Sequence, residues 1–310
     1  MIEKHISVLL NESISSLNLK ENSIIVDATL GYGGHSSSIL DRIKKGHLFA
    51  FDQDSEAIRH STDRLSKIGT NFTIIKSNFV HMKEELNKLN IDSVDGVLFD
   101  LGVSSPQLDE RERGFSFHED APLDMRMDRD QKLSAYEVVN EYSKEDLTKI
   151  FLKYGEDKFS SNIAKKIVEY RENKKIKSTL ELVEIIKTAV PMKYRLEKHP
   201  ARQIFQAIRI EVNHELDVLE PALNQALDLI KVGGRVSVIT FHSLEDRIVK
   251  NLFKEKCEID PKVKGLPNIP IEYQPYFKLV VNKAITPSEE ELKNNPRARS
   301  SKLRVIEKIR

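Results

Sequence analysis

The sequence predicts an α/β fold, a doubly wound sheet of Rossmann type that an all-helical insertion interrupts. Short β-branched runs alternate with helical patterns over residues 1–105, a glycine-rich turn follows the first of these runs, and residues 134–190 show helical spacing alone. The chain has 310 residues. This length suffices for a nucleotide-type domain of roughly 200 residues and a smaller additional one.

The first third of the chain alternates strands and helices. The expected strands are residues 23–28, 47–52, 72–76 and 94–100, and the expected helices are 35–45, 54–67 and 79–89. Strands at this spacing, with a helix between each pair, form right-handed βαβ units. We therefore expect a parallel sheet.

The character of the sequence changes near residue 106. Residues 106–132 are irregular, with prolines, glycine and many charges. The helical stretch that follows contains two Ser-x-x-acid signals for a helix start, Ser143 with Asp146 and Ser178 with Glu181. We expect these helices to run until Pro191.

The last third predicts a return to the sheet. One long helix is expected over 201–230, a strand over 235–241, and further strands over 275–283 and 302–307. The simplest organisation is one α/β domain, residues 1–107 and 201–310, with a helical insertion domain at 108–200 that we expect to recognise the substrate.

Bulk composition limits the function classes. Hydrophobic residues make up 39% and charged residues 31%, and no apolar run approaches the ~20 residues of a membrane helix. Residues 1–5 lack the layout of a secretory signal. The single cysteine, Cys257, excludes an intrachain disulfide and a cysteine-based zinc site. We expect a cytoplasmic protein without a membrane partner.

Charge is balanced overall but clustered locally. The formal net charge is +1. Basic residues gather at positions 171–177, 193–202 (including Lys198) and 297–310. Such clusters serve as phosphate contacts or are simply a solvated surface, and the sequence leaves both interpretations open.

The glycine turn is the most informative segment. The run over residues 23–26 ends in Asp27 and leads to Gly31-x-Gly33-Gly34, after which a helical pattern opens at His35. A strand, a glycine turn and a helix N-terminus together bind nucleotide-like ligands in α/β sheets. The spacing departs from the dinucleotide pattern Gly-x-Gly-x-x-Gly, which favours a different nucleoside ligand.

Chemically capable residues follow the expected strands. Asp52 ends the second strand, where an acid can accept hydrogen bonds from both ribose hydroxyls. Phe79 lies just beyond the third strand, either against an adenine ring or in the core. Asp100 ends the fourth strand, and its place at a ligand crevice suggests reaction chemistry, the alternative being a turn or capping role.

The fifth strand leads into His242. This histidine is a candidate proton shuttle or phosphate contact. Ser243 could instead cap the next helix, with Asp246 closing a capping box. The sequence contains neither a Gly-x-Ser-x-Gly elbow nor a P-loop, which argues against a serine hydrolase and a P-loop NTPase. No cluster of metal ligands stands out, so no metal site is predicted.

Taken together, these segments resemble the bacterial ribosomal RNA small-subunit methyltransferase H family, also called the MraW family. The matching strings are residues 5–12 (beginning at His5), 27–35, 100–107, 114–117, 122–128, 199–202, 205–210, 213–216, 241–247 and 295–300. They occur in order along nearly the whole chain, and several are long and unusual. One departure is His118-Glu119-Asp120-Ala121, where an Arg and a Gly would be expected.

The resemblance implies a class I methyltransferase fold and S-adenosylmethionine as methyl donor. It implies methyl transfer to the exocyclic N4 of a decoding-centre cytidine in 16S rRNA, with the small ribosomal subunit as partner. Carried over by position, the cofactor contacts are Gly33, Gly34, His35, Asp52, Phe79, Asp100 and Gln107. The sequence is also compatible with a homodimer through the insertion or the tail.

The proton acceptor is not decided at this point. Asp100, or carbonyls of the 100–105 turn, is one candidate catalytic group, and His242 is a second. The expected rRNA contacts are the helical insertion and the basic tail. Three alternatives stay open: an amino-methyltransferase for DNA or small molecules, a non-catalytic RNA assembly factor, and a nicotinamide dehydrogenase.

Overall fold

The computed structural model describes residues 6–197, 199–259, 261–263 and 265–310, so His5 and Lys198 lie outside the described residues. The chain divides into two compact units, Met1–Gly102 with Leu216–Arg310, and Val103–Glu215. The boundaries differ from the expected 107 and 200 because the helix after Pro200 packs in the second unit. Gly155 of that unit lies so close to the carbonyl of Gln203 that a Cβ would be 2.9 Å from it.

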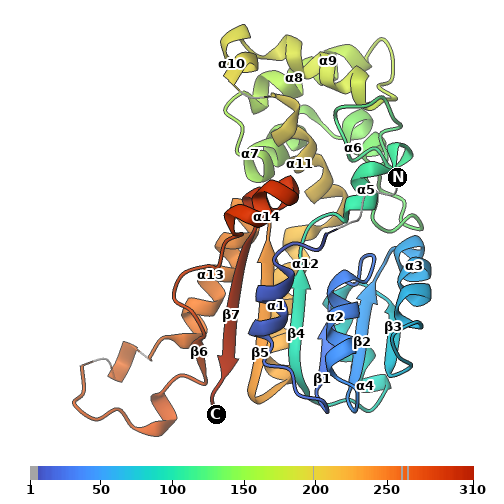
Figure 1. Ribbon diagram of the computed structural model, residues 1–310. Coiled ribbons are helices and arrows are strands. Elements are labelled where there is room, and N and C mark those ends of the chain that lie inside the picture. Colours follow the sequence, from blue (N-terminus) through green and yellow to red (C-terminus); the bar gives the residue numbers. More distant parts are fainter. Residues whose placement is uncertain (1–5, 198, 260, 264) are drawn as a thin grey trace. The chain divides into compact units, whose positions relative to one another are not determined.

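The first unit is built on a seven-stranded sheet of order β3-β2-β1-β4-β5-β7-β6 (Figure 1). The strands are β1 (Ile24–Asp27), β2 (His47–Asp52), β3 (Phe72–Lys76), β4 (Val94–Asp100), β5 (Ile230–Thr240), β6 (Phe277–Leu279) and β7 (Lys302–Lys308). The first five pair in parallel. The parallel pairing expected for the first four strands is therefore confirmed. The last two strands are antiparallel, β7 to β5 and β6 to β7, so the sheet as a whole is mixed.

Helices cover both faces of this sheet. They are α1 (Leu10–Ser16), α2 (Gly34–Arg42), α3 (Ser55–Leu65), α4 (Met82–Lys88), α12 (Glu215–Leu229), α13 (Ser243–Cys257) and α14 (Glu289–Asn294). One core cluster joins α1, α2 and α3 to the strands, for example Ile39 with Leu48. A second joins α4, α12 and α13 to the opposite face, for example Leu223 with Phe99. Figure 1 shows α1 and α2 in front of the strands. The unit is therefore doubly wound, as predicted.

Two sequence expectations need correction in this region. The helix expected over 201–230 is two helices, because His214 adopts a left-handed conformation (φ 52°) and ends the first of them. Strand β5 begins at Ile230, five residues early, and takes in a left-handed Gly233 where the register with β4 shifts. The expected strand at 275–283 is only the three residues of β6.

The second unit consists of helices joined by an irregular segment. They are α5 (Ser105–Asp109), α6 (Ala135–Glu141), α7 (Lys144–Gly155), α8 (Ser160–Arg171), α9 (Thr179–Ala189), α10 (Met192–Glu197) and α11 (Ala201–Asn213). The two predicted start signals are confirmed: Ser143 caps α7 through the Asp146 amide, and Ser178 forms a capping box with Glu181 at α9. Buried Leu147, Phe151 and Ile204 contribute to the interior of this unit.

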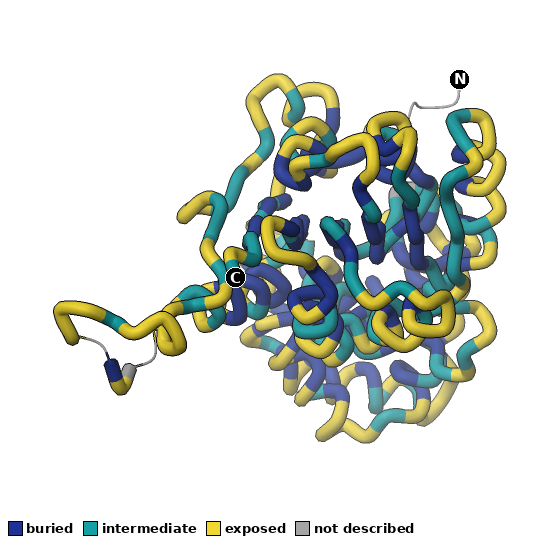
Figure 2. Tube along the Cα trace, turned by 90° about the horizontal axis from the view of Figure 1, so that it is seen from below, coloured by how far each residue is buried: buried dark blue, intermediate teal, exposed yellow. Residues whose placement is uncertain are grey.

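Exposure is concentrated in the connections. Most residues between α13 and β6 are exposed, in contrast to the buried sheet strands (Figure 2). Across the described ranges, none of the helices combines the length and apolarity that a membrane span requires.

Candidate functional site

The parallel strands bring the predicted residues to one edge of the sheet. Asp27, Asp52 and Asp100 are the last residues of β1, β2 and β4, which lie side by side. Phe79 follows β3 and His242 follows β5. The carboxyl ends of parallel strands form the ligand crevice of an open α/β sheet. The first unit thus gathers at one edge all the predicted residues except Gln107.

The glycine turn shapes the centre of this edge. Gly31 and Gly33 have φ values of 49° and 74°, a region that favours glycine. Gly33 is the N-cap of α2 and offers no side chain to the first amides of that helix. A Cβ on Gly34 would lie 1.9 Å from Ser7 Oγ, so the backbone here is closely covered by the N-terminal segment. Free helix amides beside a close backbone approach suit an anionic group.

Asp52 is anchored by backbone amides. Its Oδ2 accepts from Gly31 N–H at 2.8 Å and its Oδ1 from Asp54 N–H at 2.9 Å. Burial raises the pKa of Asp52 to about 6. Each carboxylate oxygen can accept two hydrogen bonds, so acceptor capacity remains for a ligand.

Asp27 serves the local structure. It is buried and accepts from Ser36 Oγ at 2.6 Å and from Thr29 N–H at 3.1 Å. Burial raises its pKa. These bonds join the end of β1 to the first turn of α2, and they hold the glycine turn between the two elements.

Asp100 and His35 form a pair across the edge. His35 Nδ1 lies 3.4 Å from Asp100 Oδ2, and His35 Nε2 lies 3.1 Å from the carbonyl of Val8. The amide of Asp100 donates to Thr29 Oγ1 at 2.6 Å. Within the described part of the chain, Asp100 Oδ1 is a buried atom without a hydrogen-bond partner. Buried acceptors without a partner are uncommon in folded proteins, so this oxygen calls for an explanation.

Phe79 lies in a 3-10 turn, Phe79–His81, just beyond β3. Its ring packs edge-on against Phe99 with centroids 5.6 Å apart, and it joins the rim of the core cluster. The residue is only partly buried. Part of the ring therefore packs against the core, and the exposed part is available to a planar ligand.

His242 is the N-cap of α13. Its Nδ1 accepts from Glu245 N–H at 3.4 Å, while Glu245 Oε2 accepts from the amides of Phe241 and His242. The expected cap, Ser243 with Asp246, is therefore wrong by one residue. Asp246 instead pairs with Arg304 at 2.7 Å and Lys302 at 3.0 Å. These ion pairs occupy two cations of the tail that the sequence suggested for rRNA.

Gln107 lies in the second unit and has a clear local role there. Its side-chain oxygen accepts from Ser104 N–H at 3.0 Å, and Ser104 Oγ accepts from the Gln107 amide, which closes a capping box at α5. Gln107 is buried.

The unusual loop of residues 118–121 is fixed to the start of α9. Thr179 Oγ1 donates to the Glu119 carbonyl at 2.6 Å and accepts from the Ala121 amide at 2.9 Å. Next to it, Phe117 stacks on His199 with centroids 4.7 Å apart. The departure from the family pattern therefore lies in an ordered turn.

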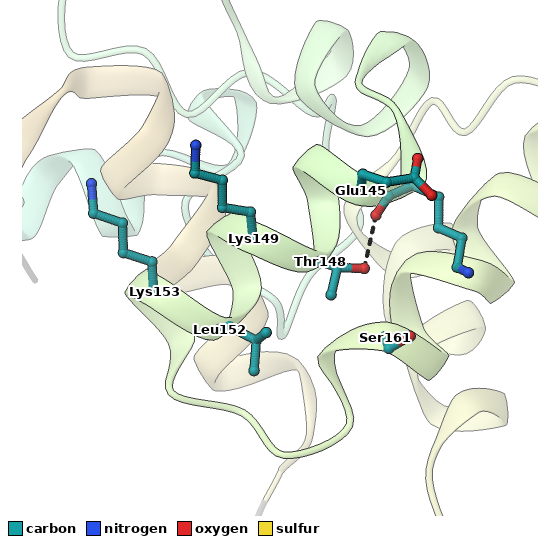
Figure 3. A pocket seen from close by; sticks show the side chains of 7 residues that line it. Glu145, Thr148, Lys149, Leu152, Lys153 and Ser161 are labelled. Atoms are coloured by element: carbon teal, nitrogen blue, oxygen red, sulfur yellow. Dashed lines mark hydrogen bonds between the residues drawn. The ribbon is translucent and has the colours of Figure 1, made fainter.

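A pocket of about 670 Å³ opens on the second unit between α7 and α8 (Figure 3). Its lining is Lys144, Glu145, Thr148, Lys149, Leu152, Lys153 and Ser161. Lys149 and Lys153, one helical turn apart, extend in the same direction (Figure 3). All three lysines are exposed. The charge and exposure of this surface suit an anionic partner.

Sequence reasoning missed the residues that support the edge. Thr29 receives the Asp100 amide, Ser61 donates to the Gly31 carbonyl at 2.6 Å, and Ser7 and Val8 cover α2. Thr29 is inside the glycine-turn string and could have been found there. Ser61 and Val8 carry no local signal, because only the folded chain brings them to the turn.

The sheet order, with a glycine turn after β1 and helices on both faces, defines a Rossmann-like α/β protein. The model of the MraW methylase family matches residues 2–309. The ribosomal RNA small subunit methyltransferase H of Exiguobacterium sibiricum is 55% identical over 308 residues, 99% of each chain. The chain therefore belongs to the MraW methylase family, whose methyl donor is S-adenosylmethionine.

Solved structures of similar proteins include an rRNA methylase from Streptococcus thermophilus, 14% identical with a TM-score of 0.44, covering 100% of this chain and 99% of that one. Another is a putative methyltransferase from Streptococcus mutans in complex with SAH, 14% identical with a TM-score of 0.46, covering 98% of this chain and all of the other.

Proposed function

We propose that this protein methylates the exocyclic N4 of a decoding-centre cytidine in 16S rRNA, within the small ribosomal subunit. Support for an rRNA substrate comes from the family match along the whole chain and from the name of the 55% identical relative. The observation that carries the chemistry is the buried, unpartnered Asp100 Oδ1 at the carboxyl edge of β4. An rRNA substrate is consistent with a cytoplasmic location.

The edge residues fit S-adenosylmethionine. Asp52 would accept from the ribose hydroxyls, the exposed part of Phe79 would lie on the adenine, and the amides of Gly33, Gly34 and His35 would face the carboxylate. Asp100 Oδ1 is the remaining acceptor. Gln107, which lies in the second unit, is the seventh residue that the family resemblance assigns to the cofactor. When bound, the cofactor supplies an electrophilic methyl group on sulfonium.

The protein has to activate a poor nucleophile. The lone pair of a cytosine amino group is delocalised into the ring, so an acceptor on the N4 hydrogens is needed to raise its nucleophilicity and to take the released proton. The acceptor would take up the N4 proton that methyl transfer releases. Holding N4, the methyl carbon and the sulfur in line would lower the activation barrier by several kcal/mol.

Asp100 is the preferred acceptor. Among the described residues, Asp100 Oδ1 and His242 Nε2 are both buried without a hydrogen-bond partner. His242 is the weaker candidate, because its Nδ1 caps α13 and its Nε2 lies 3.2 Å from Glu245 Oε1. We therefore assign His242 to positioning the strand end, and Asp100 to proton acceptance. A variant Asp100→Ala that kept normal turnover at saturating cofactor would exclude this role.

The second unit is the proposed recognition domain. The exposed lysines of α7, Lys144, Lys149 and Lys153, would contact phosphates (Figure 3). Such contacts position folded RNA without reading its sequence. The target base must leave its stack to reach the edge of the sheet, as with other base-modifying enzymes. A homodimer stays a prediction that light scattering can test.

The deciding experiment is tritium transfer from labelled S-adenosylmethionine. The acceptors are small subunits that lack this methyl group, naked 16S rRNA and a control DNA, with the labelled nucleoside identified by mass spectrometry. N4-methylated cytidine in the subunits alone is the expected result. Label in the control DNA would favour the alternative of a DNA amino-methyltransferase, and cofactor binding without transfer to any acceptor would favour an assembly factor.

A further inference from the structure

Helix α2 begins with a buried histidine whose two ring nitrogens both face acceptors. Nε2 of His35 lies 3.1 Å from the Val8 carbonyl, and Nδ1 lies 3.4 Å from Asp100 Oδ2. A carbonyl has no proton to donate, so Nε2 must carry a hydrogen. A neutral imidazole has only one N–H, which would leave the lone pair of Nδ1 facing a carboxylate.

A second proton on Nδ1 removes this conflict. Two carboxyl groups act on the ring, Asp100 at the end of β4 and Asp27 at the end of β1. Burial alone lowers the pKa of His35, but the hydrogen bond and charge of Asp100, the charge of Asp27 and the Val8 carbonyl outweigh it and raise the pKa. The imidazolium form therefore suits this site.

We propose that His35 is a positioning residue: its imidazolium, held between the Val8 carbonyl and Asp100 Oδ2, turns Asp100 Oδ1 toward the ligand. The pairing occupies one oxygen of the carboxylate and leaves the other buried and unpartnered. Because Asp100 is then bound at both its backbone, through Thr29, and its side chain, its orientation is set before any ligand arrives.

The Val8 carbonyl is itself held by the ends of the chain. The Leu9 amide donates to Glu291 Oε1 at 2.7 Å, and Asn295 Nδ2 donates to the Ile6 carbonyl at 3.0 Å. Leu9 has a left-handed conformation (φ 50°), which turns the segment at this point. Glu291 of α14 and Asn295 just after it thereby hold the segment that carries the Val8 carbonyl, the acceptor for His35 Nε2.

The first measurement is nitrogen NMR of the full chain labelled at histidine, without any ligand. The His35 signal is assigned by its absence in His35→Gln. We expect both ring nitrogens to be protonated at neutral pH, and a titration above the ordinary pKa of about 6.5. In Asp100→Asn, the titration should move to lower pH. His47, which bonds Thr73 instead, is the control that should not respond. A singly protonated His35 at neutral pH would overturn the proposal.

The second measurement is calorimetric binding of S-adenosylhomocysteine, which rests on the proposed function only in the choice of ligand. We expect His35→Gln to bind it roughly tenfold or more weakly, while His47→Gln binds as wild type does. Wild-type affinity should fall as pH rises through the pKa of His35. The imidazolium that orients Asp100 exists only below that pKa. Unchanged affinity in a folded His35→Gln would exclude the positioning role, whatever the methyl acceptor proves to be.

Discussion

At the residue scale, the edge of the sheet contains positions where a change in protonation or in side-chain size should disturb the structure or the binding of a ligand. Asp52 is a partly buried acid whose carboxylate accepts from two backbone amides, and Gly34 is covered by Ser7. Both positions can be tested by single substitutions, because the surroundings of each are known atom by atom.

The raised pKa of Asp52 predicts a pH dependence of cofactor binding. With a pKa of about 6, the carboxylate is ionised at neutral pH and becomes protonated as pH falls through 6, which weakens its acceptance of hydroxyl protons. We expect the calorimetric affinity for S-adenosylhomocysteine to decrease over that range. Asp52→Asn should bind weakly at every pH and lose this dependence. An unchanged dependence in Asp52→Asn would assign the titration to another group.

The close cover over Gly34 predicts a steric penalty that a second substitution removes. In Gly34→Ala the new Cβ would lie 1.9 Å from Ser7 Oγ, and overpacking of this kind costs about 1–3 kcal/mol of unfolding free energy. Urea denaturation measures the loss. In Ser7→Ala with Gly34→Ala the hydroxyl is gone, so most of the stability should return. Failure of this rescue would place the penalty in the backbone of the turn.

At the element scale, α13 is fastened at both its start and its side. His242 and Glu245 close the capping box, and Asp246 joins the helix to β7 through Arg304 and Lys302. These contacts tie α13 to β7, the strand that pairs antiparallel with β5.

The ion pairs of Asp246 predict a measurable loss of stability. Burial would raise the pKa of Asp246, but the hydrogen bonds and charges of Arg304 and Lys302 lower it, so the contribution is present above its ordinary pKa and lost as pH falls below it. Asp246→Asn should lower the unfolding free energy by about 1–3 kcal/mol at neutral pH. Glu84→Gln, which removes the charge of Glu84 from an exposed pair with Lys88, should change it far less, because water and salt screen exposed charges. Equal losses of unfolding free energy in the two variants would show that the ion pairs of Asp246 stabilise no more than an exposed pair does.

At the scale of the whole molecule, the α/β unit carries the proposed cofactor edge and the helical unit carries the exposed lysines of α7. The functions proposed for the two units are separable, since cofactor binding needs no RNA and phosphate contacts need no cofactor.

Phosphate contacts by α7 predict a change in the salt dependence of RNA binding. Each lost contact lowers the slope of log affinity against log salt by about 0.7–0.9. Lys149→Ala with Lys153→Ala should therefore reduce the slope by roughly 1.5 while cofactor binding stays as in wild type. Lys20→Ala is the control, because Lys20 is an exposed lysine of the first unit, shortly before β1. It should leave the slope unchanged. Filter binding to 16S rRNA across salt concentrations measures the slope for wild type and for each variant. Equal slopes for wild type and the double variant would show that α7 does not contact the RNA.

The sequence by itself determined the four N-terminal strands, the glycine turn, two helix caps in the second unit and the strand-end acids. These features follow from local rules: side-chain periodicity, glycine conformation and Ser-x-x-Glu capping act over a few residues. For the same reason the class of fold was predictable, as was the placement of the strand-end acids at one edge, because parallel strand ends meet at one side of a sheet.

Only the tertiary structure decided how these residues are used. The break at His214, the antiparallel placement of β7, the capping of α13 by His242 and the pairing of His35 with Asp100 all depend on contacts between distant segments. Val8, His35 and Asp100 are separated by many residues, so no sequence window contains their hydrogen bonds. Burial and neighbouring charge set protonation, and both come into being only when the sheet is assembled.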